Sequence, residues 1–132
     1  MRQQIKLWNV IAVFIGGCLG GLARYSIGLV VNDSKTLLGT LIVNVCGSFA
    51  LSLLTYASVR KWDLPDWLVL ACGTGFVGAF TTFSTFILEL VTNVAARPAY
   101  TLAIFGINLL LGLLAAVAGY YCAQIGQERD AA

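Results

Sequence analysis

The sequence predicts an all-α membrane protein with four transmembrane helices, the third of which is broken near its middle. Three observations support this prediction. Charged residues make up only 11% of the 132 residues, whereas a soluble domain carries about a quarter. Four stretches without Asp, Glu, Lys or Arg are each long enough to cross a bilayer. The third of these stretches contains an unusual run of Gly, Thr, Ser and Phe.

The four uncharged stretches occupy most of the chain. They are Leu7–Ala23, Thr36–Val59, Trp67–Leu88 and Pro98–Gln127. A spanning helix needs roughly 20 predominantly apolar residues. We therefore expect spans at about residues 8–31, 36–59, 65–96 and 98–125, which together make residues 1–132 a single four-span domain. The protein is expected to be a multi-pass protein of the cell (inner) membrane.

The first predicted span carries two interleaved GxxxG pairs, Gly16 with Gly20 and Gly17 with Gly21. Small residues at this spacing let two helices approach closely. We therefore interpret the four glycines as a packing face.

Basic residues flank the first span. Arg2 and Lys6 precede it, as in a signal peptide, but three further spans follow and we expect the segment to be retained. Arg24 lies near its far end, where two interpretations are open. The side chain could snorkel to the membrane surface, or its charge could concentrate anions at an aqueous vestibule.

Asn44 is a strongly polar residue in the first third of the second span. An unpaired amide is costly inside a bilayer, so this side chain needs a partner. Two interpretations are open: the amide forms a hydrogen bond to another helix, or it presents an N–H donor to an anion.

The third span contains the run GTGFVGAFTTFSTF from Gly73 to Phe86. Ser and Thr compete with the helix for backbone hydrogen bonds, and Gly adds backbone freedom, so we expect a break near residues 78–82. Non-helical backbone in a membrane is tolerated only where protein or a watery cavity covers it. The run is therefore expected to mark an ion or substrate site. Pro65 suits the first turn of this span, with Asp63 as a candidate cap.

A helix that unwinds around Gly78–Thr81 has two unsatisfied poles. Its first half ends with carbonyl groups that carry partial negative charge, and its second half begins with free N–H groups. Broken helices of this kind bind cations at the carbonyl ends and anions at the amide ends. The third span could therefore hold both kinds of ion a few residues apart.

Phe83 and Phe86 are three residues apart and share one face of the second half-helix. They are either an ordinary packing pair or a surface for an anion, because aromatic rings have positive edges. Ser84 and Thr85 lie between them and add hydroxyl groups.

The sequence lacks the side chains of an enzyme or of a thiolate metal site. It has no histidine, no paired carboxylates and no nucleophile beside a base, so we expect no enzymatic activity. The four cysteines occur singly, one in each span, which argues against a metal site built from Cys and His. The spans do contain a series of polar side chains, namely Arg24, Asn44, Ser48, Thr81, Thr82, Ser84, Thr85 and Asn108.

Positive charge is distributed almost evenly across the membrane. With both termini on one side, that side holds Arg2, Lys6, Arg60, Lys61 and Arg129, and the other holds Arg24, Lys35 and Arg97. An excess of Lys and Arg marks the cytoplasmic side. The small excess predicts either cytoplasmic termini or insertion in both orientations.

Three stretches resemble the signature motifs of the Fluc (CrcB-type) fluoride channels. They are GGCLGGLARY at residues 16–25, GTLIVNVCGSF at residues 39–49 and GFVGAFTTFSTF at residues 75–86. The motifs occur in the order of the family, and the four-span length matches throughout.

This resemblance implies a dual-topology homodimer of two antiparallel subunits, with two fluoride pores and passive export that lowers cytoplasmic fluoride. It also implies a structural Na⁺ held by the backbone carbonyls of Gly78 and Thr81 from both subunits. The side chains that it implies for the pore are Asn44, Phe83, Ser84, Thr85 and Phe86, with Arg24 as the arginine of the vestibule.

The fourth span departs from this pattern, because relatives often carry a Tyr and spaced Ser or Thr residues there. Here Asn108 is the only strongly polar residue between Ile104 and Gly112.

Two other hypotheses about the function stay open. A small dual-topology, proton-coupled multidrug exporter would need a membrane-embedded carboxylate, for which Glu89 is the only candidate. A scaffold without transport activity would use the GxxxG pairs but would leave the Thr-rich run without a role.

Overall fold

The structure, a computed structural model, describes residues 6–31, 37–60 and 64–129. Its helices are α1 (Leu7–Val31), α3 (Leu38–Arg60), α4 (Asp66–Val69), η1 (Leu70–Val77), α5 (Gly78–Phe80), α6 (Phe83–Val94) and α7 (Pro98–Arg129). Among the described residues, four segments are long and apolar enough to cross a membrane: Leu7–Val31, Leu38–Val59, Asp66–Val94 and Pro98–Ile125. The described residues contain no strand. The prediction of an all-α protein with four spanning segments is confirmed.

The observed bounds lie close to the predicted ones. The third segment ends at Val94 rather than at residue 96, because Ala95 and Ala96 form a turn before α7 begins. Pro65 is the N-cap of α4 and makes no side-chain cap bond. The predicted start of the second span at residue 36 and the candidate cap Asp63 lie outside the described residues.

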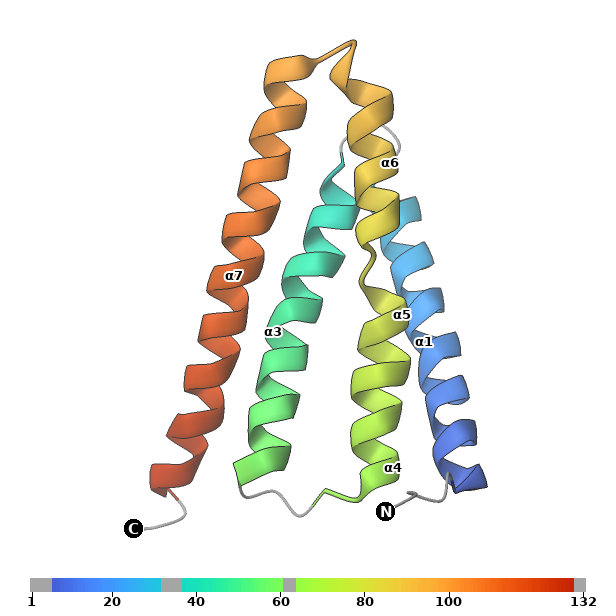
Figure 1. Cartoon of the computed structure of the whole chain (residues 1–132), viewed down its shortest axis with the longest axis vertical. Helices are drawn as coiled ribbons and strands as arrows, with labels where there is room; N and C mark the ends of the chain where they lie inside the picture. The colour runs from blue at the N-terminus through green and yellow to red at the C-terminus, as the bar shows by residue number, and fades with distance from the viewer. Residues whose placement is uncertain (1–5, 32–36, 61–63, 130–132) are drawn as a thin grey trace, which may run out of the picture.

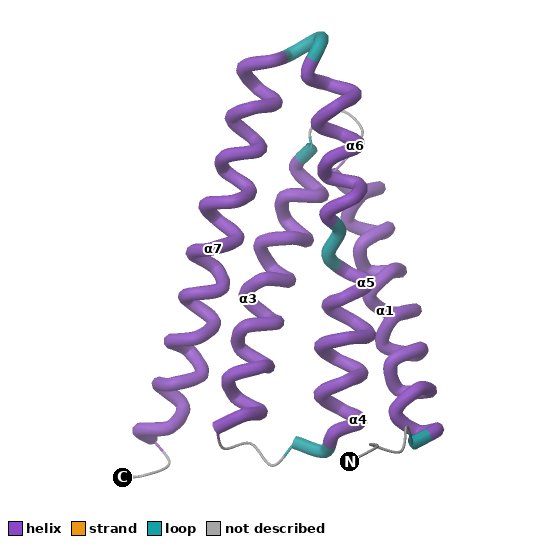
Figure 2. The backbone as a smooth tube through the Cα atoms, viewed as in Figure 1, coloured by secondary structure: helices purple, strands orange, loops and turns teal. Residues whose placement is uncertain are grey.

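The spanning segments form two helix pairs. α3 packs along α7, and α1 packs along η1 and α5 (Figure 1). α6 continues beyond α5 and packs against α7, to which a short turn joins it. The start of α1 and the end of α7 lie at the same end of the bundle (Figure 1). Within the third segment, a short loop separates α5 from α6 (Figure 2).

The third segment changes its backbone geometry four times. α4 passes into the π-helix η1, which passes into one turn of α-helix, α5. Thr81 (φ −81°, ψ 154°) and Thr82 (φ −153°, ψ 120°) are extended, and α6 then begins at Phe83. The predicted unwinding at Gly78 is wrong, because Gly78 is helical and its N–H donates to the carbonyls of Gly73 and Gly75. The π-helix was not anticipated.

Glycines bring α1 and η1 into backbone contact. A methyl group on Gly16 would overlap the carbonyl oxygen of Ala71, and one on Gly20 would overlap that of Phe76. One on Gly75 would lie 2.6 Å from the carbonyl oxygen of Val13. The packing face therefore consists of the pair Gly16 and Gly20.

The second GxxxG pair is not used in the same way. A methyl group on Gly17 would meet only the carbonyl oxygen of Gly75, at 3.9 Å, and Gly21 faces open space within this chain. Within this chain the packing face therefore includes Gly16 and Gly20, while the part of the interpretation that concerns Gly21 stays a prediction. The reason is that one face of a helix repeats at three to four residues, so Gly16 and Gly20 share a side that Gly21 does not.

A small apolar core joins α6 to α7 and to the start of α3. Phe86, Leu37 and Ile104 are buried against one another, with Leu90 and Phe105 packed around them. The rings of Phe86 and Phe105 are stacked with centroids 6.0 Å apart. This core fixes the position of α6 beyond the extended residues.

We expect the substitution Gly20→Ala to destabilise the fold by about 1–3 kcal/mol, because the added methyl group overpacks a backbone contact. Gly21→Ala is the matched control, and its better helix propensity should leave stability unchanged or slightly higher. Thermal unfolding of the purified protein in detergent, followed by circular dichroism, measures both effects. Equal melting temperatures for the two variants would contradict the α1–η1 contact.

Candidate ion-binding site

Asn44 on α3 holds the extended backbone of the third segment. Its Nδ2 donates a hydrogen bond to the Thr82 carbonyl at 3.1 Å, and its Oδ1 accepts one from the Thr82 N–H at 2.9 Å. Both main-chain polar groups of Thr82 are therefore satisfied by one side chain. The interhelical interpretation of Asn44 is observed, and its amide nitrogen carries a second N–H for a further acceptor.

Thr82 also caps the helix that follows it. Its Oγ1 accepts a hydrogen bond from the Thr85 N–H at 3.2 Å and donates one to the Thr85 Oγ1 at 3.0 Å. The hydroxyl of Ser84 lies 3.4 Å from the same oxygen. Because Thr85 accepts from Thr82, its own hydroxyl proton is available to a different acceptor.

These contacts redirect the N–H groups that a continuous helix would use. In an α-helix the carbonyl of Gly78 would accept from the N–H of Thr82, but that N–H donates to Asn44. The carbonyl of Thr81 would likewise accept from the N–H of Thr85, which donates to the Thr82 hydroxyl. The two carbonyls named in the sequence prediction thus lose their ordinary helical donors.

The neighbouring carbonyl of Val77 is satisfied. It accepts from the N–H of Thr81 at 3.0 Å and from the hydroxyl of Thr81 at 2.9 Å. The Thr81 side chain therefore bonds back to the last residue of η1. The main-chain oxygen of Thr81, by contrast, lacks the N–H donor that it would have in a continuous helix.

Phe83 and Phe86 lie in different surroundings although their ring centroids are 6.3 Å apart. Phe86 is only 1% exposed and belongs to the core between α6 and α7. Phe83 is 66% exposed and lies beside the extended residues. The packing interpretation therefore describes Phe86, whereas the Phe83 ring is open to a partner or a ligand.

A groove of about 350 Å³ lies at the break, where α3, the third segment and α7 meet, and its lining is partly polar. Asn44, Thr81, Thr82 and Phe83 line it at the break, and Ser48, Asn108 and Gly112 line it farther along. Asn108 is only 6% exposed, and its Nδ2 has no hydrogen-bond partner among the residues that the structure describes. Asn108 is not among the predicted pore residues, and the sequence signal for it is a lone amide in an apolar span.

Arg24 and Glu89 do not line this groove. Arg24 is half-buried on α1, one turn beyond Gly20, where α1 packs beside Phe76. Glu89 is half-buried on α6, more than one turn beyond Phe83. Neither charge is placed where it would directly contact an ion at Asn44.

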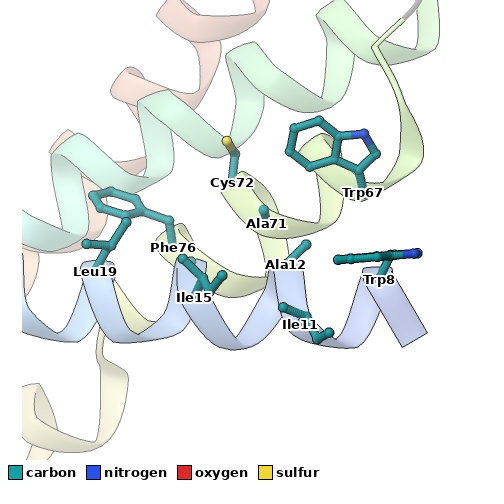
Figure 3. Close-up of a pocket in the computed structure, with 10 residues that line it drawn as sticks. Trp8, Ile11, Ala12, Ile15, Leu19, Trp67, Ala71, Cys72 and Phe76 are labelled. Atoms are coloured by element: carbon teal, nitrogen blue, oxygen red, sulfur yellow. The ribbon is translucent and has the colours of Figure 1, made fainter. Parts of the chain in front are cut away.

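A second groove, of about 540 Å³, is almost wholly apolar and lies between α1 and the α4–η1 segment. Figure 3 shows the indole rings of Trp8 and Trp67 at one end of it and Phe76 and Leu19 at the other. The thiol of Cys72 also lies on this groove. Because it offers no charge and no amide or hydroxyl side chain, this groove is unsuited to an ion.

The four cysteines are free. Within the described part of the chain, no group of three or more His, Cys, Asp or Glu side chains could hold a metal ion. A cation near the break would therefore depend on oxygen atoms of the main chain and of hydroxyl groups.

A known protein family and several known proteins are similar to most of this chain. The family described as CrcB-like protein, Camphor Resistance (CrcB), matches residues 11–120. The chain is 39% identical to "Fluoride-specific ion channel FluC 2" of Ligilactobacillus salivarius, over 96% of this chain and 97% of the relative.

Two further relatives are similar over most of their length. "Fluoride-specific ion channel FluC" of Thermosipho melanesiensis is 42% identical over 83% of this chain and 90% of the relative. "Fluoride-specific ion channel FluC 2" of Geobacillus kaustophilus is 43% identical over 86% of this chain and 92% of the relative. With a family match over most of its length and relatives of this identity, the chain belongs to the CrcB-like protein family.

Proposed function

We propose that this protein is a fluoride-selective passive channel that lets fluoride leave the cytoplasm and so lowers its intracellular concentration. The observation that carries the proposal is the clamp between Asn44 and Thr82, which holds a non-helical backbone beside a groove that the amide of Asn44 and the hydroxyl of Ser48 help to line. The relatives named as fluoride-specific channels support the choice of anion. A channel needs no catalytic group, in agreement with the absence of histidine.

Fluoride is small and strongly hydrated, so a pore selects it only by replacing its water at a narrow point. The donors that this chain offers near the break are the second N–H of Asn44, the hydroxyl proton of Thr85 and the hydroxyl of Ser84. The positive ring edge of Phe83 adds a weaker contact. Phe86 supports this ring from the core, and Arg24 attracts anions toward the entrance.

We also propose that two copies pair as an antiparallel homodimer of dual topology. Main-chain polar groups at membrane depth must be covered by protein or water, and one chain leaves Phe83 and Gly78 exposed at the break. A second copy that crosses at this point would cover them and complete two equivalent pores. The small excess of positive residues on one side is compatible with insertion in both orientations.

The carbonyls of Gly78 and Thr81 are the proposed ligands of a structural Na⁺ at the centre of this dimer. Both have lost their helical donors to Asn44 and Thr82, so their lone pairs are available to a cation. A hard cation prefers oxygen ligands. Two such carbonyls from each copy would satisfy these groups without any acidic side chain.

Fluoride efflux from liposomes, compared with chloride efflux, tests the function. We expect selective fluoride efflux that needs no proton gradient. We expect Phe83→Ile to lower this efflux at least about ten-fold, which corresponds to an increase of about 1.4 kcal/mol in the activation free energy. Phe14→Ile is the control, because Phe14 is 71% exposed but lies on α1 away from the groove. Phe86→Ile should also lower flux, but with a loss of stability because its ring is in the core.

Two outcomes of this assay would count against the proposal. Full fluoride flux in Phe83→Ile would contradict the assignment of the pore. Efflux that requires a proton gradient and is abolished by Glu89→Gln would instead favour the proton-coupled exporter.

We expect Asn44→Asp to abolish fluoride flux and lower the melting temperature. The carboxylate would still accept from the Thr82 N–H, but it would place a negative oxygen against the Thr82 carbonyl and remove both N–H donors. Asn93→Asp is the control, because the Asn93 amide donates to the Glu89 carbonyl of its own helix at 2.8 Å. Retained flux in Asn44→Asp would show that the clamp is not needed for conduction.

Removal of Na⁺ should destabilise the dimer. A ligand that binds only the folded state raises stability with its concentration, so the melting temperature should rise with NaCl and not with N-methylglucamine chloride at equal ionic strength. Analytical ultracentrifugation in detergent should show the dimer dissociating more readily without Na⁺. Identical melting curves in the two salts would exclude a stabilising Na⁺.

A further inference from the structure

The apolar groove between α1 and the α4–η1 segment, which we call the α1–η1 groove, has no part in the proposed function. Its volume is about 540 Å³, and aromatic and aliphatic side chains line it together with the Cys72 thiol. Its two walls meet at Gly16, where a methyl group would overlap the carbonyl oxygen of Ala71. Its outer side is open, because Ile15 and Leu19 are 53% and 55% exposed. A ligand can therefore enter this groove from the surrounding bilayer.

The π-helix η1 provides most of one wall of this groove. Hydrogen bonds in a π-helix join residues five apart, and such turns are frequent at functional sites. The wider turn keeps residues four to five positions apart on one face, so Cys72 and Phe76 line the groove together with Trp67 of α4. The wall on α1 follows the three- and four-residue spacing of one helical face. It includes Trp8, Ile11, Ile15 and Leu19.

The length of the α1–η1 groove matches one leaflet of a bilayer. Trp8 is the second residue of α1 and Trp67 is the second residue of α4, so both rings lie where a spanning segment begins. From Trp8 to Leu19 the groove follows eleven residues of helix, about 16 Å. Half of a hydrocarbon core of about 30 Å is about 15 Å. An acyl chain that starts at the tryptophans would therefore end beside Phe76, near the middle of the membrane.

The mouth of the groove carries polar groups that suit a lipid headgroup. In Figure 3 the ring nitrogens of Trp8 and Trp67 lie on the sides of the rings that are turned away from Phe76. Tryptophan rings at the membrane–water interface lie at the level of the headgroups, where their N–H groups find acceptors. Exposed charges of both signs accompany the rings, since Lys6 directly precedes α1 and Asp66 is the first residue of α4. This pair is complementary to a headgroup that contains a phosphate and an ammonium group.

We propose that the α1–η1 groove binds one phospholipid whose headgroup carries both charges, as phosphatidylethanolamine does. One acyl chain lies along the groove as far as Phe76. The indole N–H groups of Trp8 and Trp67 donate to the ester oxygens. Lys6 pairs with the phosphate, and Asp66 pairs with the ammonium group.

The bound lipid stabilises the third segment next to the break. The rings of Phe76 and Phe80 are stacked with centroids 5.6 Å apart. Phe80 is the last residue of α5 and directly precedes the extended Thr81. The end of the acyl chain therefore contacts the ring stack that leads to the break. Because a ligand of the folded state raises stability with its concentration, this lipid should raise the melting temperature.

Native mass spectrometry of the full-length protein in detergent, with palmitoyl-oleoyl phosphatidylethanolamine added, tests the site. We expect Leu19→Trp to fill the groove and weaken lipid binding at least about ten-fold. Each buried methylene group contributes about four-fold to the affinity, and the larger ring displaces about two of them. Leu22→Trp is the matched control, because Leu22 is 62% exposed on α1 but does not line the groove. Equal lipid binding by the wild type and Leu19→Trp would overturn the proposal.

The headgroup is tested by a comparison of two lipids. We expect the wild type to bind phosphatidylethanolamine more tightly than phosphatidylglycerol. Asp66→Asn should reduce this preference about two- to five-fold, which is the range of an exposed ion pair. If both proteins bind phosphatidylglycerol as tightly as phosphatidylethanolamine, the pairing of Asp66 with the ammonium group is wrong.

A measurement on the wild type covers the case in which a variant fails to fold. Phosphatidylethanolamine should slow the alkylation of Cys72 by N-ethylmaleimide, whereas Cys122, which is exposed on α7 and outside the groove, should react at an unchanged rate. Unchanged alkylation of Cys72 would overturn the proposal. So would a wild type that retains no lipid while Leu19→Trp, unlike Leu22→Trp, elutes as a monomer, because a second copy of this chain would then occupy the groove.

Discussion

The two hydrogen bonds between Asn44 and Thr82 are the constraint on which the third segment depends. Without them, the N–H and carbonyl of an extended residue would lie unpaired in a bilayer, where each unpaired group is costly. A continuous helix would pair these groups within itself and would need no side chain of α3. The clamp therefore makes an interrupted backbone tolerable, and it does so with one side chain from a neighbouring span.

The close approach of α3 to the interruption follows from its sequence. Gly47 lies one turn beyond Asn44, and a methyl group there would overlap the side chain of Thr81. The glycine lets α3 come near enough for the short Asn44 side chain to reach Thr82. The motif residues Asn44 and Gly47 thus act together. Asn44 donates and accepts the hydrogen bonds, and Gly47, which has no side chain, lets α3 approach Thr82 closely enough for them to form.

Much of the fold follows from local sequence features, because uncharged length and polar loops determine where spans begin and end. The Thr-rich run predicted an interruption, but its first residue was placed too early. A glycine such as Gly78 allows the helix to unwind but does not require it to do so. Thr82, by contrast, is extended because it forms hydrogen bonds with Asn44 on α3. The π-helix lies where Gly75 packs against Val13 and Gly16, a tertiary contact that the local sequence does not reveal.

For the site residues too, local sequence predicts some features, whereas tertiary contacts determine the others. Sequence spacing placed Phe83 and Phe86 on one face, but only the packing of α6 on α7 buries Phe86 and leaves Phe83 exposed. Likewise, Asn108 becomes informative only when the packing of α7 against α3 places it in the same groove as Asn44. Periodicity describes which residues share a side of one helix, whereas a site depends on what the next helix places there.

The interruption explains how a chain without acidic side chains at the break could serve ions of both signs. Diverting the N–H groups of Thr82 and Thr85 leaves the oxygens of Gly78 and Thr81 at the end of α5, while donors gather around Asn44 and Thr85 at the start of α6. Opposite charges attract far more strongly in a medium of low dielectric constant than in water. A cation held by the carbonyls would therefore lower the free energy of a dehydrated anion held by the donors, so that each proposed site makes the other more favourable.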